Sequence, residues 1–236
     1  MRITLLGQAG FHILTDSGLS VMIDPYLSDT LCQKNGKLFE RMVPMSEEWK
    51  SANVNVLLFT HDHEDHFDIE SIRMFLSLSR PVLVCSPYSI FKQLKKIYPN
   101  HNYVVMRPSV EYSYGGLHIR AIEAFHEDSD SLGYVISADG VNAWFSGDTL
   151  FSRKIVEDIG DVHVDLAFIS INGVGNNMNA VDAASLIKLI EPDIAVPVHW
   201  DMFEHYGVDP TGFTSLFSTK DRTRTKVLKA YESIEF

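Results

Sequence analysis

A short run between residues 60 and 68 concentrates side chains that could bind metal ions. It reads Thr-His-Asp-His-Glu-Asp-His-Phe-Asp and contains His61, His63, Asp65 and His66. Histidine nitrogens and carboxylate oxygens are ligands for zinc, manganese and iron in proteins. In a loop directly after a strand, His61 and His63 can point the same way while Asp65 and His66 turn toward a second position. One segment can therefore serve two metal ions, and the missing ligands must come from elsewhere in the chain.

Three further candidates share one property, which is that each follows an apolar strand: His126, Asp148 and His199. Functional groups in α/β proteins gather at the ends of strands. A single histidine in such a place is most often structural, but three such positions together with the dense His/Asp run favour a metal centre. The sequence Gly147-Asp148-Thr149 contains no serine nucleophile. A hydrolase built on these residues therefore needs the metals for its chemistry.

The elements that must position these residues follow from hydrophobic periodicity and turn residues. We expect strands over residues 2–7, 11–15, 20–23, 55–60, 81–85, 103–106, 110–114, 117–125, 133–138, 142–146, 165–170 and 193–197. We expect helices over residues 68–79, 88–98, 149–159 and 180–190, the last capped by Asn179. The order is β-rich, α/β, β-rich, α/β, which predicts two sheets face to face with helices outside. No linker divides the chain, so residues 1–236 are expected to form a single domain.

Composition narrows the function classes. The 236 residues are 45% hydrophobic and 22% charged, with a net charge of −11. This acidity, with scattered Lys and Arg, argues against a nucleic-acid partner. No apolar stretch reaches the length of a membrane span, and the two cysteines suit a reducing compartment. We expect a cytoplasmic protein that acts on a small anionic molecule, without a membrane partner; the sequence leaves a homo-oligomer open.

Taken in order, the metal-binding candidates resemble the motifs of the metallo-β-lactamase fold superfamily, and Asp24-Pro25 fits the same pattern. The resemblance covers nearly the whole chain. It implies a four-layer αββα sandwich of two mixed β-sheets with outer helices. It also implies that His61, His63 and His126 hold one metal, that Asp65, His66 and His199 hold another, and that Asp148 bridges them. Asp24 would support a ligand histidine from behind.

Two further blocks are similar to the ascorbate-6-phosphate lactonase group of metal-dependent hydrolases. They are the segment 171–179, rich in Asn and Gly, and the segment 199–203, His-Trp-Asp-Met-Phe. The resemblance implies opening of a phosphorylated sugar lactone and two divalent metal ions, with Mn²⁺ or Zn²⁺ ahead of Fe. The expected substrate-contacting residues are Asn172, Asn176, Asn177 and His205. An equally good interpretation of the Asn-rich segment is a plain turn and helix cap.

The chemistry expected of such a site is hydrolysis by a hydroxide held between the two metals, which lower the pKa of water to about 7. Asp65, Asp148 and Asn172 are the expected catalytic residues. Gln8 could face the cleft or lie in a surface turn. The main alternative is a phosphodiesterase acting on a small phosphodiester with the same site. A third class, a di-iron redox protein or a binding module, is disfavoured because His63 stands where a di-iron relative would usually carry Glu.

Overall fold

The computed structural model describes residues 1–77 and 80–236. Its first sheet has seven strands in the order β14-β1-β2-β3-β4-β5-β6. Strands β14, β1, β2 and β3 run antiparallel, whereas β3, β4, β5 and β6 run parallel. The bounds are β1 Arg2–Gly7, β2 Gly10–Leu14, β3 Ser20–Ile23, β4 Val56–Leu58, β5 Leu83–Ser86, β6 Asn102–Val105 and β14 Ser233–Glu235.

The second sheet has the order β13-β12-β11-β10-β9-β8-β7. It is mixed in the same manner: β10 to β13 pair in parallel, and β7 to β10 pair antiparallel. The bounds are β7 Glu111–Tyr114, β8 Leu117–Glu123, β9 Leu132–Ala138, β10 Val141–Phe145, β11 Leu166–Ser170, β12 Ile194–Val198 and β13 Arg224–Thr225. Both sheets therefore join a meander to a parallel half.

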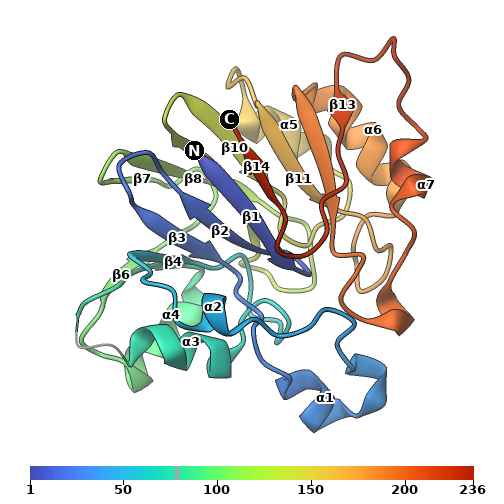
Figure 1. The fold of residues 1–236 in the computed structure, drawn as a ribbon. Helices are drawn as coiled ribbons and strands as arrows, with labels where there is room; N and C mark the ends of the chain where they lie inside the picture. The colour runs from blue at the N-terminus through green and yellow to red at the C-terminus, as the bar shows by residue number, and fades with distance from the viewer. Residues whose placement is uncertain (78–79) are drawn as a thin grey trace.

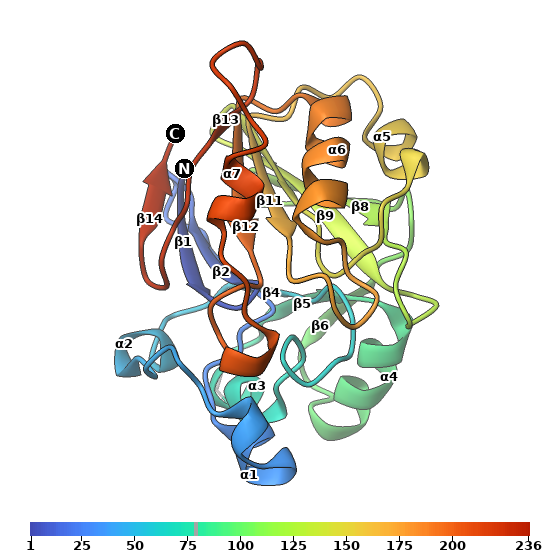
Figure 2. The same ribbon diagram turned by 90° about the vertical axis from the view of Figure 1, so that its right-hand side faces the viewer.

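Helices cover the outer face of each sheet, while the inner faces form the main core. Figure 1 shows α3 and α4 beside the first sheet and α5 and α6 beside the second, and Figure 2 shows the same layers turned by 90°. Apolar side chains of α3 and α4 pack on the first sheet, and those of α5, α6 and α7 pack on the second. The bounds are α1 Thr30–Asn35, α2 Glu47–Lys50, α3 Ile69–Leu76, α4 Tyr88–Ile97, α5 Arg153–Ile159, α6 Ala180–Ile190 and α7 Thr211–Thr214.

The predicted α/β sandwich of two mixed sheets with outer helices is confirmed. Helix α6 has the predicted bounds, and the Asn179 side chain accepts hydrogen bonds from the backbone N–H groups of Val181 and Asp182. The helix expected over 149–159 begins only at Arg153, because Ser152 caps it. The helix expected over 68–79 spans Ile69–Leu76, and the end of that prediction, 78–79, lies outside the described residues.

Several short helices and a strand were not predicted from the sequence. The segment between β3 and β4 forms α1, a short 3-10 helix η1 at Lys37–Phe39, and α2. A second short 3-10 helix, η2, covers Glu204–Tyr206. The sequence did not predict β14 either, which pairs with β1 and buries Ile234. None of the helices in the described ranges is both long and apolar enough to cross a bilayer.

Loops at the ends of strands from both sheets meet at one place. The backbone oxygen of Thr60, just after β4, accepts a hydrogen bond of 2.9 Å from the N–H of Leu132 at the start of β9. Gly147, just after β10, packs so closely there that a Cβ would lie 3.0 Å from the Thr60 Cβ. Gly147 also has φ +58, a conformation that glycine adopts readily. The segment 60–66 and Asp148 are thereby brought to the same edge.

Candidate metal centre

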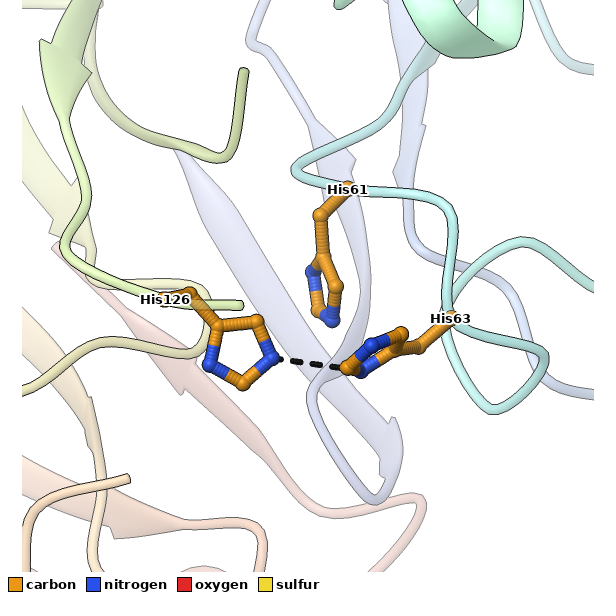
Figure 3. A group of neighbouring side chains, drawn as sticks. All are labelled: His61, His63 and His126. Carbon is orange, nitrogen blue, oxygen red and sulfur yellow. Dashed lines mark hydrogen bonds between the residues drawn. The ribbon is translucent and has the colours of Figure 1, made fainter. Parts of the chain in front are cut away.

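The first group of ligands consists of His61, His63 and His126, here called the first trio. Each offers a ring nitrogen, and these nitrogens lie within 4.8 Å of one another. Figure 3 shows the three rings converging, with the contact of 3.1 Å between His63 Nδ1 and His126 Nε2 drawn as a dashed line. His61 is fully buried, whereas His63 is about one third exposed. The structure thus brings together the three histidines expected to hold one metal.

The second group consists of Asp65, His66 and His199, here called the second trio. Their ligand atoms also lie within 4.8 Å of one another. Asp65 Oδ2 is 3.8 Å from His66 Nε2 and 3.4 Å from His199 Nε2. His199 follows β12 with φ 62, a left-handed conformation that turns the chain at the strand end. The second predicted set is therefore also assembled.

Asp148 lies against the second trio. Its Oδ1 is 3.3 Å from His66 Nε2 and its Oδ2 is 3.2 Å from His199 Nε2. Asn177 donates a hydrogen bond of 2.6 Å to Oδ2, and Ser170 donates one of 3.3 Å to Oδ1. The carboxylate is 4% exposed. These contacts fix its orientation, while a bridge between two metals stays a prediction.

The donor atoms fit metal ions by a further criterion. In the described part of the chain, the Nε2 atoms of His61 and His66 are buried and have no hydrogen-bond partner. A buried polar atom without a partner costs about 1–3 kcal/mol, so such atoms are uncommon without a reason. Both nitrogens point into the trios, where a divalent cation would satisfy them. The residues present therefore fit one cation in each trio.

Asp24 holds this arrangement from behind, as expected. Its Oδ2 lies 2.9 Å from His66 Nδ1 and accepts the Thr60 hydroxyl, and its Oδ1 accepts the Thr60 N–H at 2.9 Å. Since the carboxylate favours a proton on Nδ1 of His66, it directs the Nε2 lone pair toward the site. The Thr60 Oγ1 lies 2.9 Å from His61 Nδ1 and extends the network to the first trio.

The two trios differ in electrostatics. Burial lowers the pKa of His61 well below its usual range, and the neighbouring His66 adds to this effect. Burial opposes charge on His66 and His199 too, but the carboxylates of Asp148 and Asp65 outweigh it. They raise the pKa of His66 well above its usual range and that of His199 to about 9. The second trio therefore lies in a field that favours positive charge.

Gln8 was expected either to face the cleft or to lie in a surface turn, and the structure places it in the cleft. The side chain is 3% exposed, and its amide nitrogen contacts Asp65 and His199. Sequence spacing carries no sign of this contact, because the two partners are far along the chain. The Gly-Gln-Ala-Gly turn that presents Gln8 was the sole available signal.

The four expected substrate residues are placed differently from one another. Asn172 and Asn177 line the cleft, although Asn177 uses its amide on Asp148. Asn172 Oδ1 is buried and has no hydrogen-bond partner in the described part of the chain. Asn176 donates to Glu127 at 3.0 Å, and its backbone oxygen contacts His126 Nδ1. His205 is exposed and lines a neighbouring groove, so it is not brought to the metal centre.

A cleft of about 150 Å³ opens in front of the second trio. Its other wall is apolar and comes from the segment after β3 and the loop after β12. Phe39 contacts the rings of Phe203 and Tyr206, with centroids 5.6 and 5.4 Å apart. Among the described residues, those that line the cleft include no Lys or Arg. They are Gln8, Leu31, Phe39, His63, Asp65, Asp148, Asn172, Val174, Gly175, Asn177, His199, Phe203 and Tyr206.

Known proteins resemble the chain over most or all of its length. A metal-dependent hydrolase of the UPF0173 group from Methanobrevibacter smithii is 25% identical, with 92% of this chain and 89% of the relative covered. The metallo hydrolase Igni18 from Ignicoccus hospitalis superposes with a TM-score of 0.75 at 24% identity, covering 100% of this chain and 98% of the other. An isothiocyanate hydrolase from Delia radicum gut bacteria gives 0.79 at 17% identity, covering 100% and 99%.

The family model described as a β-lactamase superfamily domain matches residues 19–200. This range contains both trios, Asp148 and the strands that deliver them. The solved structures share the fold, and the family match covers most of the chain. The chain belongs to the metallo-β-lactamase superfamily.

Proposed function

We propose that the protein is a metal-dependent hydrolase that cleaves the C–O bond of a small, uncharged carboxylic ester, most naturally a lactone. The observation that carries the proposal is the position of the second trio and Asp148, which face an apolar wall across a small cleft. Metal-dependent hydrolase is also the name given to the Methanobrevibacter relative. The site thus supplies ligands for the chemistry and an apolar surface for the rest of the substrate.

Two divalent ions, when bound, supply a hydroxide at neutral pH and polarise the bond that is broken. The chain's own residues orient the reactants. Asp65 can accept a hydrogen bond from the attacking group, and Asp148 is held in place by Asn177 and Ser170. Asn172 lines the cleft, and its buried amide oxygen has no hydrogen-bond partner in the described part of the chain, so a rotation of the side chain would let this oxygen accept a hydrogen bond from a substrate hydroxyl. No serine or cysteine nucleophile is required.

Charge distinguishes an uncharged lactone from a phosphorylated one. A phosphorylated sugar lactone carries its phosphate away from the ester bond that is cleaved, and phosphate sites in proteins usually supply Arg or Lys to meet it. The lining residues in the described part of the chain supply neither. The helix N-terminus that could have received a phosphate is capped by Asn179. An uncharged lactone needs no such group, so the lining of the cleft supports an uncharged substrate in place of the anionic one expected from the sequence.

The test is a substrate panel with protein loaded separately with Mn²⁺ and Zn²⁺. The panel contains uncharged γ- and δ-lactones, aryl esters, a phosphorylated sugar lactone, a small cyclic phosphodiester and an isothiocyanate. We expect the highest kcat/KM on uncharged lactones, with activity lost in Asp148→Asn. A metal-replete protein that is inert on lactones and esters but cleaves the phosphodiester would overturn the proposal.

The apolar wall gives a second, independent readout. Phe39→Ala should raise KM on lactones with apolar substituents about tenfold or more, because an aromatic side chain that the substrate covers contributes a few kcal/mol to binding. The matched control is Phe151→Ala, an exposed phenylalanine that is absent from the cleft lining. If both variants have the same KM as the native chain, the wall does not bind substrate.

A further inference from the structure

Backbone hydrogen bonds hold Gln8 beside the second trio. It lies in the turn between β1 and β2 with φ 56, a left-handed conformation that non-glycine residues adopt only where the surrounding structure holds them. Its backbone oxygen accepts the His199 N–H at 2.9 Å, and its own N–H donates to Asp201 Oδ1 at 3.3 Å. The β1–β2 turn and the loop after β12 therefore hold each other in register. This bonding fixes where the Gln8 side chain starts.

The head of that side chain lies among the metal ligands. Gln8 Nε2 is 2.6 Å from Asp65 Oδ2 and 3.0 Å from His199 Nε2. The ligand atoms of the second trio and Asp148 lie 3.2 to 3.8 Å from one another where they are in contact. Neighbouring ligand atoms about 2.1 Å from one cation in an octahedron are about 3 Å apart. The side-chain amide of Gln8 therefore lies at the distance from Asp65 and His199 that a further ligand of the same cation would have.

We propose that Gln8 is an additional ligand of the cation in the second trio, binding it through the amide oxygen Oε1. The amide oxygen and nitrogen have nearly the same size, so turning the amide exchanges them at little steric cost. The Asp65 carboxylate accepts the amide N–H, whereas a cation held by Asp65 and His199 takes the oxygen. Gln8 is 3% exposed, so little solvent competes for its amide.

This ligand makes the second trio richer in oxygen than the first. The first trio offers three imidazoles, whereas the second position would combine two imidazoles with the carboxylates of Asp65 and Asp148 and the Gln8 amide. Carboxylate and carbonyl oxygens suit Mn²⁺, while zinc is satisfied by four ligands. Loss of Gln8 should therefore weaken Mn²⁺ binding at the second position more than Zn²⁺ binding.

The experiment measures metal content rather than activity, so it does not depend on the proposed substrate. Native protein, Gln8→Met and Gln8→Glu are dialysed against graded Mn²⁺ or Zn²⁺, and bound metal is counted by mass spectrometry. In Gln8→Met, which keeps the length but has no oxygen, the affinity for the second Mn²⁺ should fall at least about tenfold. Gln8→Glu, which keeps an oxygen, should retain or increase that affinity. The first equivalent serves as the internal reference.

Two results would overturn the proposal. One is native affinity for both Mn²⁺ equivalents in Gln8→Met. The other is a loss in Gln8→Glu as large as that in Gln8→Met, which would mean that Gln8 acts by donating to Asp65 and not by coordination. Gln93→Met, on the exposed face of α4, is the matched control. Thermal melting of the chelator-treated variants separates lost affinity from lost folding, since a folded Gln8→Met that retains the first equivalent reports on the second position alone.

Discussion

Replacing Asp24 by Asn tests how the fold prepares the second trio. The carboxylate is 1% exposed and serves three donors: the Thr60 N–H, the Thr60 hydroxyl and His66 Nδ1. The side-chain oxygen of Asn can still accept the hydrogen bond from the Thr60 N–H. Its NH₂ group, however, replaces the oxygen that faces the other two donors. We expect Nδ1 of His66 to accept a hydrogen bond from this NH₂ group. The ring proton of His66 then moves from Nδ1 to Nε2.

Two magnitudes follow. A buried hydrogen bond to a charged group contributes about 1.5–3 kcal/mol, so the free energy of unfolding of Asp24→Asn should fall by about that amount. Asp24→Ala would leave all three donors without a partner and should cost about 3–5 kcal/mol, as for a broken buried ion pair. A proton on Nε2 blocks coordination by His66. The affinity for the second metal should therefore fall about 10- to 100-fold, as for other residues that support a ligand.

Urea unfolding of the chelator-treated protein gives the stability change, and dialysis with metal counting gives the affinity change. Nitrogen NMR of the histidine rings reports the tautomer of His66 directly. Asp68→Asn is the matched control, because Asp68 is 2% exposed, lies in the same segment, caps α3 and likewise accepts a buried hydroxyl, that of Ser71. An Asp24→Asn protein that binds both metals with native affinity would refute the role given to Asp24.

Three other outcomes are expected. Asn177→Ala removes the 2.6 Å donor to Asp148 and should lower the affinity for the second metal about tenfold in metal-counting dialysis. Gly147→Ala should reduce the free energy of unfolding by about 2–4 kcal/mol in urea, because φ is +58 and the new Cβ would lie 2.8 Å from the Leu132 backbone oxygen. Burial, aided by the charge of Arg2, lowers the pKa of His12 from 6.5 to about 4. The unfolded chain then binds more protons between these values, so acidification through that window should cost about 3 kcal/mol at most, and His12→Gln should lack this loss in urea titrations at pH 7 and pH 4.

Sequence patterns predicted the sheets and the outer helices where periodicity was long. Helix α6 has eleven residues with an apolar face and a capping Asn, and its bounds were correct. Strand β14 has three residues and pairs with β1 across almost the entire chain. The segment holding α1 and η1 has no apolar period, and its Leu31 and Phe39 pack in a small cluster with Phe203. Short elements stabilised by distant partners carry no local pattern.

The metal ligands were predictable because their residue types and strand-end positions are visible in the sequence. The contacts that orient those ligands were not. Gln8 reaches His199 across 191 positions, and the partner of Asn177 is fixed by the loop before α6. Such contacts depend on how two sheets dock, which spacing along one chain does not determine. The same limit applies to Phe39, whose place in the cleft follows from its packing on Phe203.

Backbone conformation around the centre indicates that the site is shaped before metal binds. Gln8, Asp24 and His199 have φ values of 56, 42 and 62. Non-glycine residues in this region cost about 1–3 kcal/mol each and persist only where surrounding structure holds them. Here that structure is protein: the hydrogen bond from His199 to Gln8 and those from Thr60 to Asp24. Small metal-nucleated domains differ, because their ligands are unordered without the ion. The protein should therefore keep its fold when metal is removed and lose mainly the stability that bound metal adds, about 2.7 kcal/mol at a metal concentration of 100 Kd.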